Sequence, residues 1–255
     1  MPAPLPQRSA RPRRAWVVPL VLAALTGCGS AAEPPGEQRG FALPDRSLTV
    51  SVADGDLDIR PADVAEVQVT RYVDAWSLTG ADPRPTWKLS GQTLTLALDC
   101  GLVVFGRCDA RYEVLVPRGV DVAVEGGSGE IAAEGFATAL RVTSDNGAVR
   151  VADASGPLAL ETSSGRLTAT GIAAGHTTAE SENGEIDLSY AEVPDRVRAT
   201  ADNGAVSLTL PEAPYALTAT TDSGTVDSDL SEDPGSPHTV TVTTDNGAIG
   251  LHTAR

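Results

Sequence analysis

The stretch "TTDNGAIGL", Thr243–Leu251, repeats a phrase that the chain uses several times before it. The phrase consists of an acidic residue, Asn or Ser, then Gly, followed two places later by a branched apolar residue. Its other copies are SDNGAV from Ser144, SENGEI from Ser181, ADNGAV from Ala201 and TDSGTV from Thr221. A phrase copied at similar spacing indicates a structural repeat and not a single functional site.

The glycines of this phrase, with two related ones, set the period of the repeat. Successive glycines are separated by 18 to 23 residues. Two places after each glycine stands a branched apolar residue, and the positions four after, five before and seven before are mostly apolar, with polar residues between them. Alternation with a period of two on both sides of a turn predicts two short strands per repeat. The aligned glycines are Gly129, Gly147, Gly165, Gly184, Gly204, Gly224 and Gly247.

A period of about 20 residues with two short strands predicts an all-β fold, a β-solenoid or β-helix-like stack of coils. We expect each coil to lie on the previous one, so that equivalent residues form columns. The glycine would supply a positive φ at each corner, and the neighbouring Asn would tolerate the left-handed region. Because Asn-Gly is also a strong hairpin signal, an antiparallel β-sandwich or meander is the alternative. The aligned columns favour the solenoid.

The sequence predicts a single β-repeat domain over residues 45–255. Its first part, 45–125, alternates less regularly and is expected to form irregular coils and a cap, while 126–255 contains the regular repeats. The stretch Arg71–Lys88 breaks the alternation and contains Trp76 and Trp87. We expect this stretch to form a long loop or a cap over the open end of the solenoid.

The N-terminal region has the order of parts of a lipoprotein signal peptide, residues 1–27. A segment with four Arg precedes an apolar run of 11 residues, Ala15–Leu25, which is shorter than the roughly 20 residues that a membrane span needs. The run ends in "LTGC", which resembles a lipobox and implies a lipid on Cys28. Residues 28–44 are rich in Pro and Gly and would form a lipid-anchored flexible tether. We therefore expect export and anchoring to the outer face of the cell membrane.

Charge and cysteine content agree with an exported protein. The chain has 34 acidic and 19 basic residues, a formal net charge of -15. Nucleic acid is not expected as a partner, since binding to its phosphates requires Lys and Arg. Cys100 and Cys108 are spaced unlike a usual zinc pair, and an oxidising compartment permits a bond between them. The spacing and the compartment together favour a disulfide.

No motif of a nucleotide-binding protein, a serine hydrolase or a zinc protease occurs in the sequence. We therefore expect no enzyme activity, no catalytic residue and no cofactor. One column of acidic residues would stack at about 4.8 Å per coil, and calcium favours such oxygen ligands. Hydrogen bonding to the turn's own N–H groups is the preferred explanation for the column, so no metal site is predicted. The column consists of Glu182, Asp202, Asp222 and Asp245.

Three features together resemble a bacterial family of β-strand-repeat proteins known as putative adhesins. They are "WKLSGQTLTLALDC" from Trp87, the cysteine pair leading into "ARYEVLVP" from Ala110, and the run of NGAV-type phrases. The resemblance covers roughly Leu48–Leu251. The family is a domain of unknown function common in actinobacteria, and it implies an all-β repeat fold, usually outside the membrane, with no catalytic residues.

These observations lead to a functional expectation and two alternatives. The chain is expected to be a non-enzymatic lipoprotein of the cell envelope that serves adhesion or scaffolding. Its partners would be the membrane, through the lipid on Cys28, and an unidentified envelope or extracellular ligand. One alternative is a polysaccharide-active enzyme on a β-solenoid scaffold, and the other is an accessory subunit of an envelope signalling system.

Overall fold

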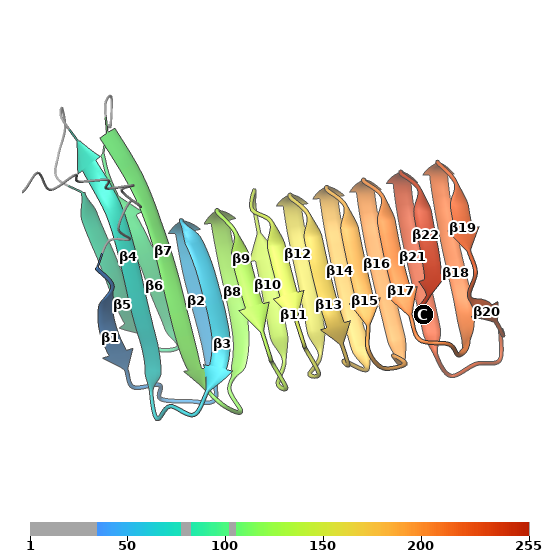
Figure 1. Ribbon diagram of the computed structural model, residues 1–255, viewed down its shortest axis with the longest axis horizontal. Helices are drawn as coiled ribbons and strands as arrows, with labels where there is room; N and C mark the ends of the chain where they lie inside the picture. The colour runs from blue at the N-terminus through green and yellow to red at the C-terminus, as the bar shows by residue number, and fades with distance from the viewer. Residues whose placement is uncertain (1–34, 78–82, 102–105, 255) are drawn as a thin grey trace, which may run out of the picture. The chain divides into compact units, whose positions relative to one another are not determined.

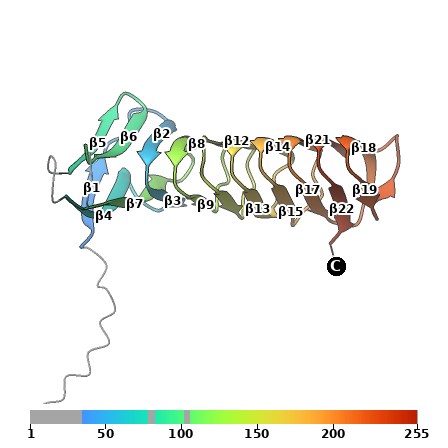
Figure 2. The same ribbon diagram turned by 90° about the horizontal axis from the view of Figure 1, so that it is seen from above.

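The computed structural model describes residues 35–77, 83–101 and 106–254, and its regular structure there is entirely β. The strands form two sheets of eleven strands each, which face one another across a continuous apolar core. Figure 2 shows the coils passing from one sheet to the other and back. The predicted all-β solenoid is therefore confirmed. Over the described ranges, no helix with the length and apolarity of a membrane span is found.

Each regular coil contributes one strand to each sheet and turns between them at the glycine phrase. Neighbouring coils pair in parallel and in register in both sheets, as with Val142 beside Leu160 and Val149 beside Leu167. This pairing excludes the antiparallel alternative for the regular repeats. The coils are β8 (Asp121–Ser128) with β9 (Ile131–Glu134), β10 (Leu140–Ser144) with β11 (Val149–Ala152), β12 (Leu158–Ser164) with β13 (Leu167–Ile172), β14 (His176–Asn183) with β15 (Ile186–Tyr190), and β16 (Arg196–Asn203) with β17 (Val206–Leu210).

The next two coils are stacked in reverse order. The coil of β21 (Thr239–Asn246) and β22 (Ile249–Thr253) lies between β16–β17 and the coil of β18 (Pro214–Ser223) and β19 (Val226–Ser228) (Figure 1). The expectation that every coil lies on the previous one is wrong here. The segment 229–238, which contains the short β20 (Ser231–Glu232), is long enough to carry the chain back past one coil.

The opposite end is closed by antiparallel strands. The coil of β2 (Ser47–Asp54) and β3 (Asp56–Ala62) lies between the β8–β9 coil and the coil of β6 (Thr93–Asp99) and β7 (Gly106–Pro117). Beyond β6 and β7, the edges are completed by β1 (Glu37–Phe41), β4 (Val67–Ser77) and β5 (Arg84–Ser90).

Two expectations about this end change. The stretch expected as a loop or cap provides parts of the two cap strands β4 and β5, with residues 78–82 outside the described ranges. Part of the range expected as a tether forms β1, because Phe41 is buried and its ring lies edge-on to Trp87. The guanidinium of Arg71 on β4 lies 4.0 Å from the centre of the Trp87 ring on β5 and so connects the two cap strands.

The columns predicted from the sequence form the core. In the coils built around Gly129, Gly147, Gly165, Gly184, Gly204 and Gly247, all four inward positions are buried. In the last coil, β18–β19, the equivalent Leu217 and Ala219 are partly exposed and Val226 is 46% exposed. Burial is incomplete there because only one neighbouring coil covers this coil.

The corner glycines are required by close packing and not by a left-handed backbone. Of the seven repeat glycines only Gly129 has a positive φ, so the expected positive φ is wrong for the other six. A Cβ on each of these six would overlap the carbonyl oxygen of the glycine in the adjacent coil; for example, one on Gly204 would meet the oxygen of Gly184. A column of glycines therefore allows neighbouring corners to touch.

The asparagines of the phrase also act between coils. No Asn in the described ranges has a positive φ, so the role expected for Asn is wrong. Instead, the Asn246 amide donates to the Oδ1 of Asn203 at 3.1 Å, and the Asn203 amide donates to the Oδ1 of Asn183 at 3.2 Å. The three side chains form a hydrogen-bonded ladder along the corner.

Replacing Gly204 with Ala should lower the free energy of unfolding by about 1–3 kcal/mol, as overpacking of a close contact usually does. The added methyl would meet the carbonyl oxygen of Gly184, so the corner that contains residue 204 would have to move away from the adjacent coil. The matched control is Gly235→Ala, whose methyl would approach only the flexible carboxylate of Asp233. Thermal unfolding of both variants measures the difference, and equal melting temperatures would contradict the packing explanation.

Candidate functional site

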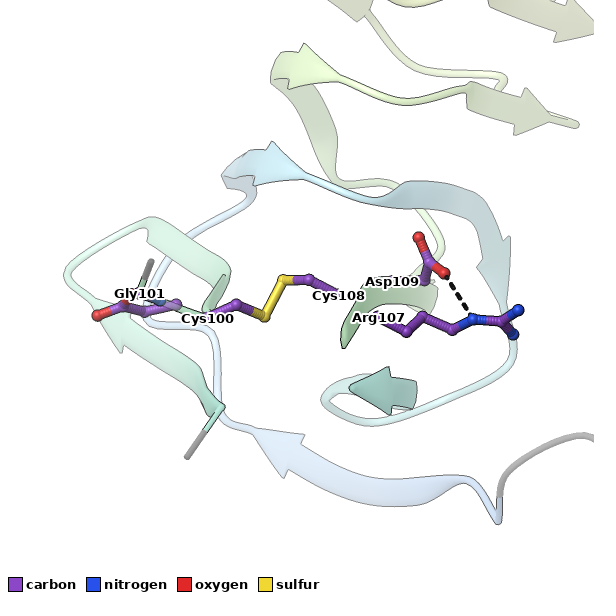
Figure 3. Close-up of a disulfide and its surroundings, with 6 residues drawn as sticks. Cys100, Gly101, Arg107, Cys108 and Asp109 are labelled. Carbon is purple, nitrogen blue, oxygen red and sulfur yellow. Dashed lines mark hydrogen bonds and ion pairs between the residues drawn. A yellow bond between two sulfur atoms is a disulfide. The ribbon is translucent and has the colours of Figure 1, made fainter. Parts of the chain in front are cut away.

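Of the site residues expected from the sequence, the cysteine pair is the one that the structure joins. Cys100 and Cys108 form a disulfide, with a Cα–Cα distance of 6.1 Å (Figure 3). Cys100 is buried just after β6, whereas Cys108 lies exposed in β7. Beside it, Arg107 lies within ion-pair distance of Asp109 and Asp74. Cys28 lies outside the described residues, so its lipidation stays a prediction.

The disulfide lies in the connection between β6 and β7, beside the column of corner glycines. The column of corner glycines runs from Gly224 back to Gly129 and Gly55, and a Cβ on Gly55 would meet the carbonyl oxygen of Ala110 at 2.5 Å. Ala110 belongs to β7, which follows the cysteine-bridged connection. The covalent bond thus links the end of β6 to the beginning of β7 at this corner.

The acidic column lies on the surface at the corners. Glu182, Asp202, Asp245 and Asp222 are exposed and follow one another in that spatial order, because the β21–β22 coil is inserted before β18–β19. Within the described residues, no group of three or more His, Cys, Asp or Glu is arranged to hold a metal ion. The column therefore offers no assembled calcium site in this structure.

A groove on the outer face of one sheet is the most site-like feature. It has a volume of about 490 Å³ and is lined by residues of β7, β3, β9, β11 and β13. Figure 1 shows these strands one after another in their sheet. Its floor contains the small outward side chains of Ala132 and Ala152, which lie between longer charged ones. The polar side chains that line it are Asp58, Arg60, Glu113, Glu134, Arg150, Thr168 and Thr170.

The groove brings two carboxyl groups onto neighbouring strands. Asp58 of β3 lies directly beside Glu113 of β7 in the parallel register. Partial burial is the main cause that raises the pKa of Asp58 above its ordinary value; Arg111 lowers it by less, and Glu113 and Glu130 raise it further. Arg111 is 3.3 Å from Glu113, so the charge of one of these carboxylates is partly compensated.

A raised pKa in a depression beside a second acidic group is a feature of functional sites. The arrangement can bind a ligand with mixed polar groups, because both charge signs line the groove and the small floor admits a chain laid across the strands. Asp58 and Arg150 lie on either side of Ala132 in the register of neighbouring strands. Arg150, which forms an ion pair with Glu130, therefore supplies positive charge across the groove floor from Asp58.

Sequence reasoning missed this groove for a topological reason. Asp58 and Glu113 are separated by 55 residues in the chain and belong to the irregular region. They become neighbours because β7 is placed beside β3 after the chain has formed the cap strands β4 and β5. The available signal was the pair of outward polar residues in "DLDIR" and "RYEVL", but nothing in the repeat period shows which strands adjoin.

The fold defines a class: a parallel β-solenoid domain with two facing sheets and a packed glycine corner. The sequence profile of the family described as Toastrack DUF4097 matches residues 42–251, and the chain belongs to this family. This membership confirms the resemblance found in the sequence, and the family is one of unknown function. No curated protein matches the chain.

Two solved structures are similar in fold. A putative adhesin from Bacteroides fragilis is 13% identical, with a TM-score of 0.50 over 86% of this chain and 97% of that one. A putative adhesin from Parabacteroides distasonis is 10% identical, with a TM-score of 0.45 over 85% of this chain and 97% of that one. At this identity the first structure supports the fold alone, and it supplies no functional residues.

The pKa of Asp58 should fall when Glu113 is replaced by Gln, because a neighbouring negative charge that raises this pKa disappears. A carboxyl-carbon NMR titration measures both proteins, with Asp187→Asn on the same outer face as the control. Because its folded-state pKa is raised, Asp58 favours folding most at low pH, and this contribution is lost as the pH rises through that pKa. A pKa of 3.8 or lower for Asp58 in the native protein would contradict the proposed environment.

Proposed function

We propose that this protein is a non-enzymatic binding protein of the bacterial cell envelope, which serves adhesion or scaffolding. It is held at the outer face of the cell membrane by a lipid on Cys28. Its solenoid presents the groove across β7, β3, β9, β11 and β13 to a ligand in the envelope or outside the cell. That groove is the observation that carries the proposal.

Three further observations support placement outside the cytoplasm. The basic segment, short apolar run and Leu-Thr-Gly-Cys sequence are typical of lipoprotein export. The disulfide between Cys100 and Cys108 is of a kind that persists in oxidising compartments. The solved structure of similar fold from Bacteroides fragilis is described as a putative adhesin, and the proposed surface location agrees with that description.

The groove suits binding because it is built on rigid elements. Its outward side chains lie on five hydrogen-bonded strands, whose inward residues, among them Ile59, Val114 and Val151, are fully packed in the core. A site on such a scaffold needs little ordering when a ligand binds, which reduces the entropic cost of association. Charged side chains of both signs can give orientation to the ligand.

A polysaccharide-active enzyme on the same scaffold is the second candidate. The observation that favours it is the Asp58–Glu113 pair, since glycoside hydrolysis uses two carboxyl groups, one with a raised pKa as the acid. Asp58 is, however, only partly buried, with much of the residue open to solvent, and it lies close to Arg111, so it lacks the enclosed environment of a strong general acid. Binding without chemistry is therefore the preferred function.

Filling the groove should abolish binding. Ala132→Trp places a large ring on the groove floor, and we expect the protein to lose its retention on insoluble bacterial cell-wall material while its melting temperature stays unchanged. Ser207→Trp, on the outer face of β17 away from the groove, is the matched control and should still bind. If the Ala132→Trp protein is still retained on the cell-wall material, the groove is not the binding site. If the native protein releases reducing ends from this material and the Asp58→Asn protein does not, the protein is an enzyme instead.

The anchor has a separate test in the cell. Cys28→Ser should move the protein from washed membranes to the soluble or secreted fraction, or leave an uncleaved precursor, with the fold intact. The lipid is the reason, because each buried methylene contributes about 0.8 kcal/mol and two acyl chains give a stable anchor. Fractionation with immunodetection measures the distribution. If the variant is processed and still sediments with membranes, the protein is not held by this lipid.

A further inference from the structure

The solenoid has one end whose sheet edge is largely unpaired. β18 pairs with β21 on one side, and on its other side the described residues supply only β20, which covers Pro214 and Tyr215. The remaining eight residues, Ala216–Ser223, form the edge of their sheet, and β19 is the edge of the other (Figure 1).

The backbone groups along this edge can be assigned from one hydrogen bond. The Ala216 N–H donates to the His238 oxygen of the neighbouring coil at 2.8 Å. In a parallel sheet, successive residues direct their backbone groups to opposite sides. Leu217, Ala219 and Thr221 therefore direct their N–H and C=O groups away from β21, toward the position that a further strand would occupy.

The other end of the solenoid carries features that discourage strand addition. Its edge strand β5 contains Pro85, which has no N–H to donate, and Lys88, whose charge opposes burial. Such residues are typical protective devices on natural sheet edges. In β18 the edge from Ala216 to Ser223 contains neither Pro nor Lys and is rich in Thr, which favours strands.

The charge at the unpaired end is strongly negative. No Lys or Arg occurs between residues 199 and 254, whereas eight acidic residues do. Asp222 lies on β18 itself and Asp227 on β19. A second copy meeting this end with its own would bring like charges together, and β5 of a second copy presents Pro85. The acidic residues of 199–254 are Asp202, Glu212, Asp222, Asp227, Asp229, Glu232, Asp233 and Asp245.

We propose that the edge Ala216–Ser223 of β18 binds an extended segment of a partner protein that carries Lys or Arg, as an additional strand of the sheet. Backbone hydrogen bonds to Leu217, Ala219 and Thr221 supply the affinity common to any strand. The negative charge of Asp222 on β18, within the acidic end of the solenoid to which Asp227 also belongs, selects a basic segment over an acidic one. This surface is separate from the groove, so it does not depend on the function proposed for the groove.

The test uses the full chain and synthetic peptides followed by fluorescence anisotropy. A peptide in which Val and Lys alternate should bind, and its affinity should fall with added salt. The same peptide with Glu in place of Lys, or with a central Pro, should bind at least about tenfold more weakly, because charge complementarity or the backbone ladder is lost. Equal binding of the three peptides, or no binding of the basic one, would overturn the proposal.

Two variants locate the binding on β18. Ala219→Pro removes an N–H that is directed away from β21, toward the added strand. Asp222→Asn with Asp227→Asn removes negative charge and leaves the backbone unchanged. Each of these variants should bind the basic peptide at least about tenfold more weakly than the native protein does. Asp145→Asn with Asp187→Asn, on exposed positions of middle coils, is the control and should bind as before. Unchanged binding of the basic peptide by the charge variant would refute a basic partner. If the mass of the protein instead increases with its concentration, and Ala219→Pro removes that increase, the edge binds a second copy of this chain and the proposal is also refuted.

Discussion

The structure depends on the contact between the corner of one coil and the corner of the next. In a parallel, in-register stack each residue meets its own equivalent about 4.8 Å away, so the tightest position must be filled by a residue without a Cβ. The column from Gly55 to Gly224 meets this requirement, with each glycine lying against a backbone carbonyl of the neighbouring coil. The asparagine ladder beside it adds hydrogen bonds that also require exact register.

In-register stacking also explains how the outer surfaces arise. Once the corners are aligned, outward residues form rows, so a run of small residues in neighbouring coils becomes a depression. Ala132 and Ala152 give the groove its floor in this way, although each is unremarkable within its own coil. The coil with the bridged Cys100–Cys108 corner then brings Glu113 beside Asp58 and supplies the acidic side of the groove.

Much of the fold could be predicted because the spacing and alternation of a sequence repeat indicate the length and position of its strands. The alternation around each glycine defined two strands and the inward columns, and the spacing of Cys100 and Cys108 together with the exported context favoured their disulfide. The backbone conformation of the corner could not be read, because glycine serves both positive φ and close packing and the sequence does not distinguish them. The groove also escaped prediction, since its Asp58–Glu113 pair depends on where the irregular coil of β7 is placed.

Coil order was the other feature hidden from the sequence. The coils of β16 and β18 have nearly the same pattern, and both pair in register with the coil of β21, one on each side. Equivalent residues would pair whichever of these coils came next in the stack, so the repeat period is compatible with more than one spatial order of the coils. Only the length of the connection 229–238 distinguishes the coil that returns, and a long connection alone does not specify its destination.

Disulfide cross-linking between outward positions tests the in-register stack and its order most directly. Thr200 lies beside Thr243 in the register, and Thr243 lies beside Thr220. Cysteines at 200 and 243 should therefore form a disulfide on mild oxidation, because neighbouring strands place Cα atoms within the roughly 4.4–6.8 Å that the bond needs. Cysteines at 200 and 220 would be two strands apart and should stay reduced. Cross-linking of 200 to 220 and not to 243, read by mass spectrometry of the intact fold, would contradict the account.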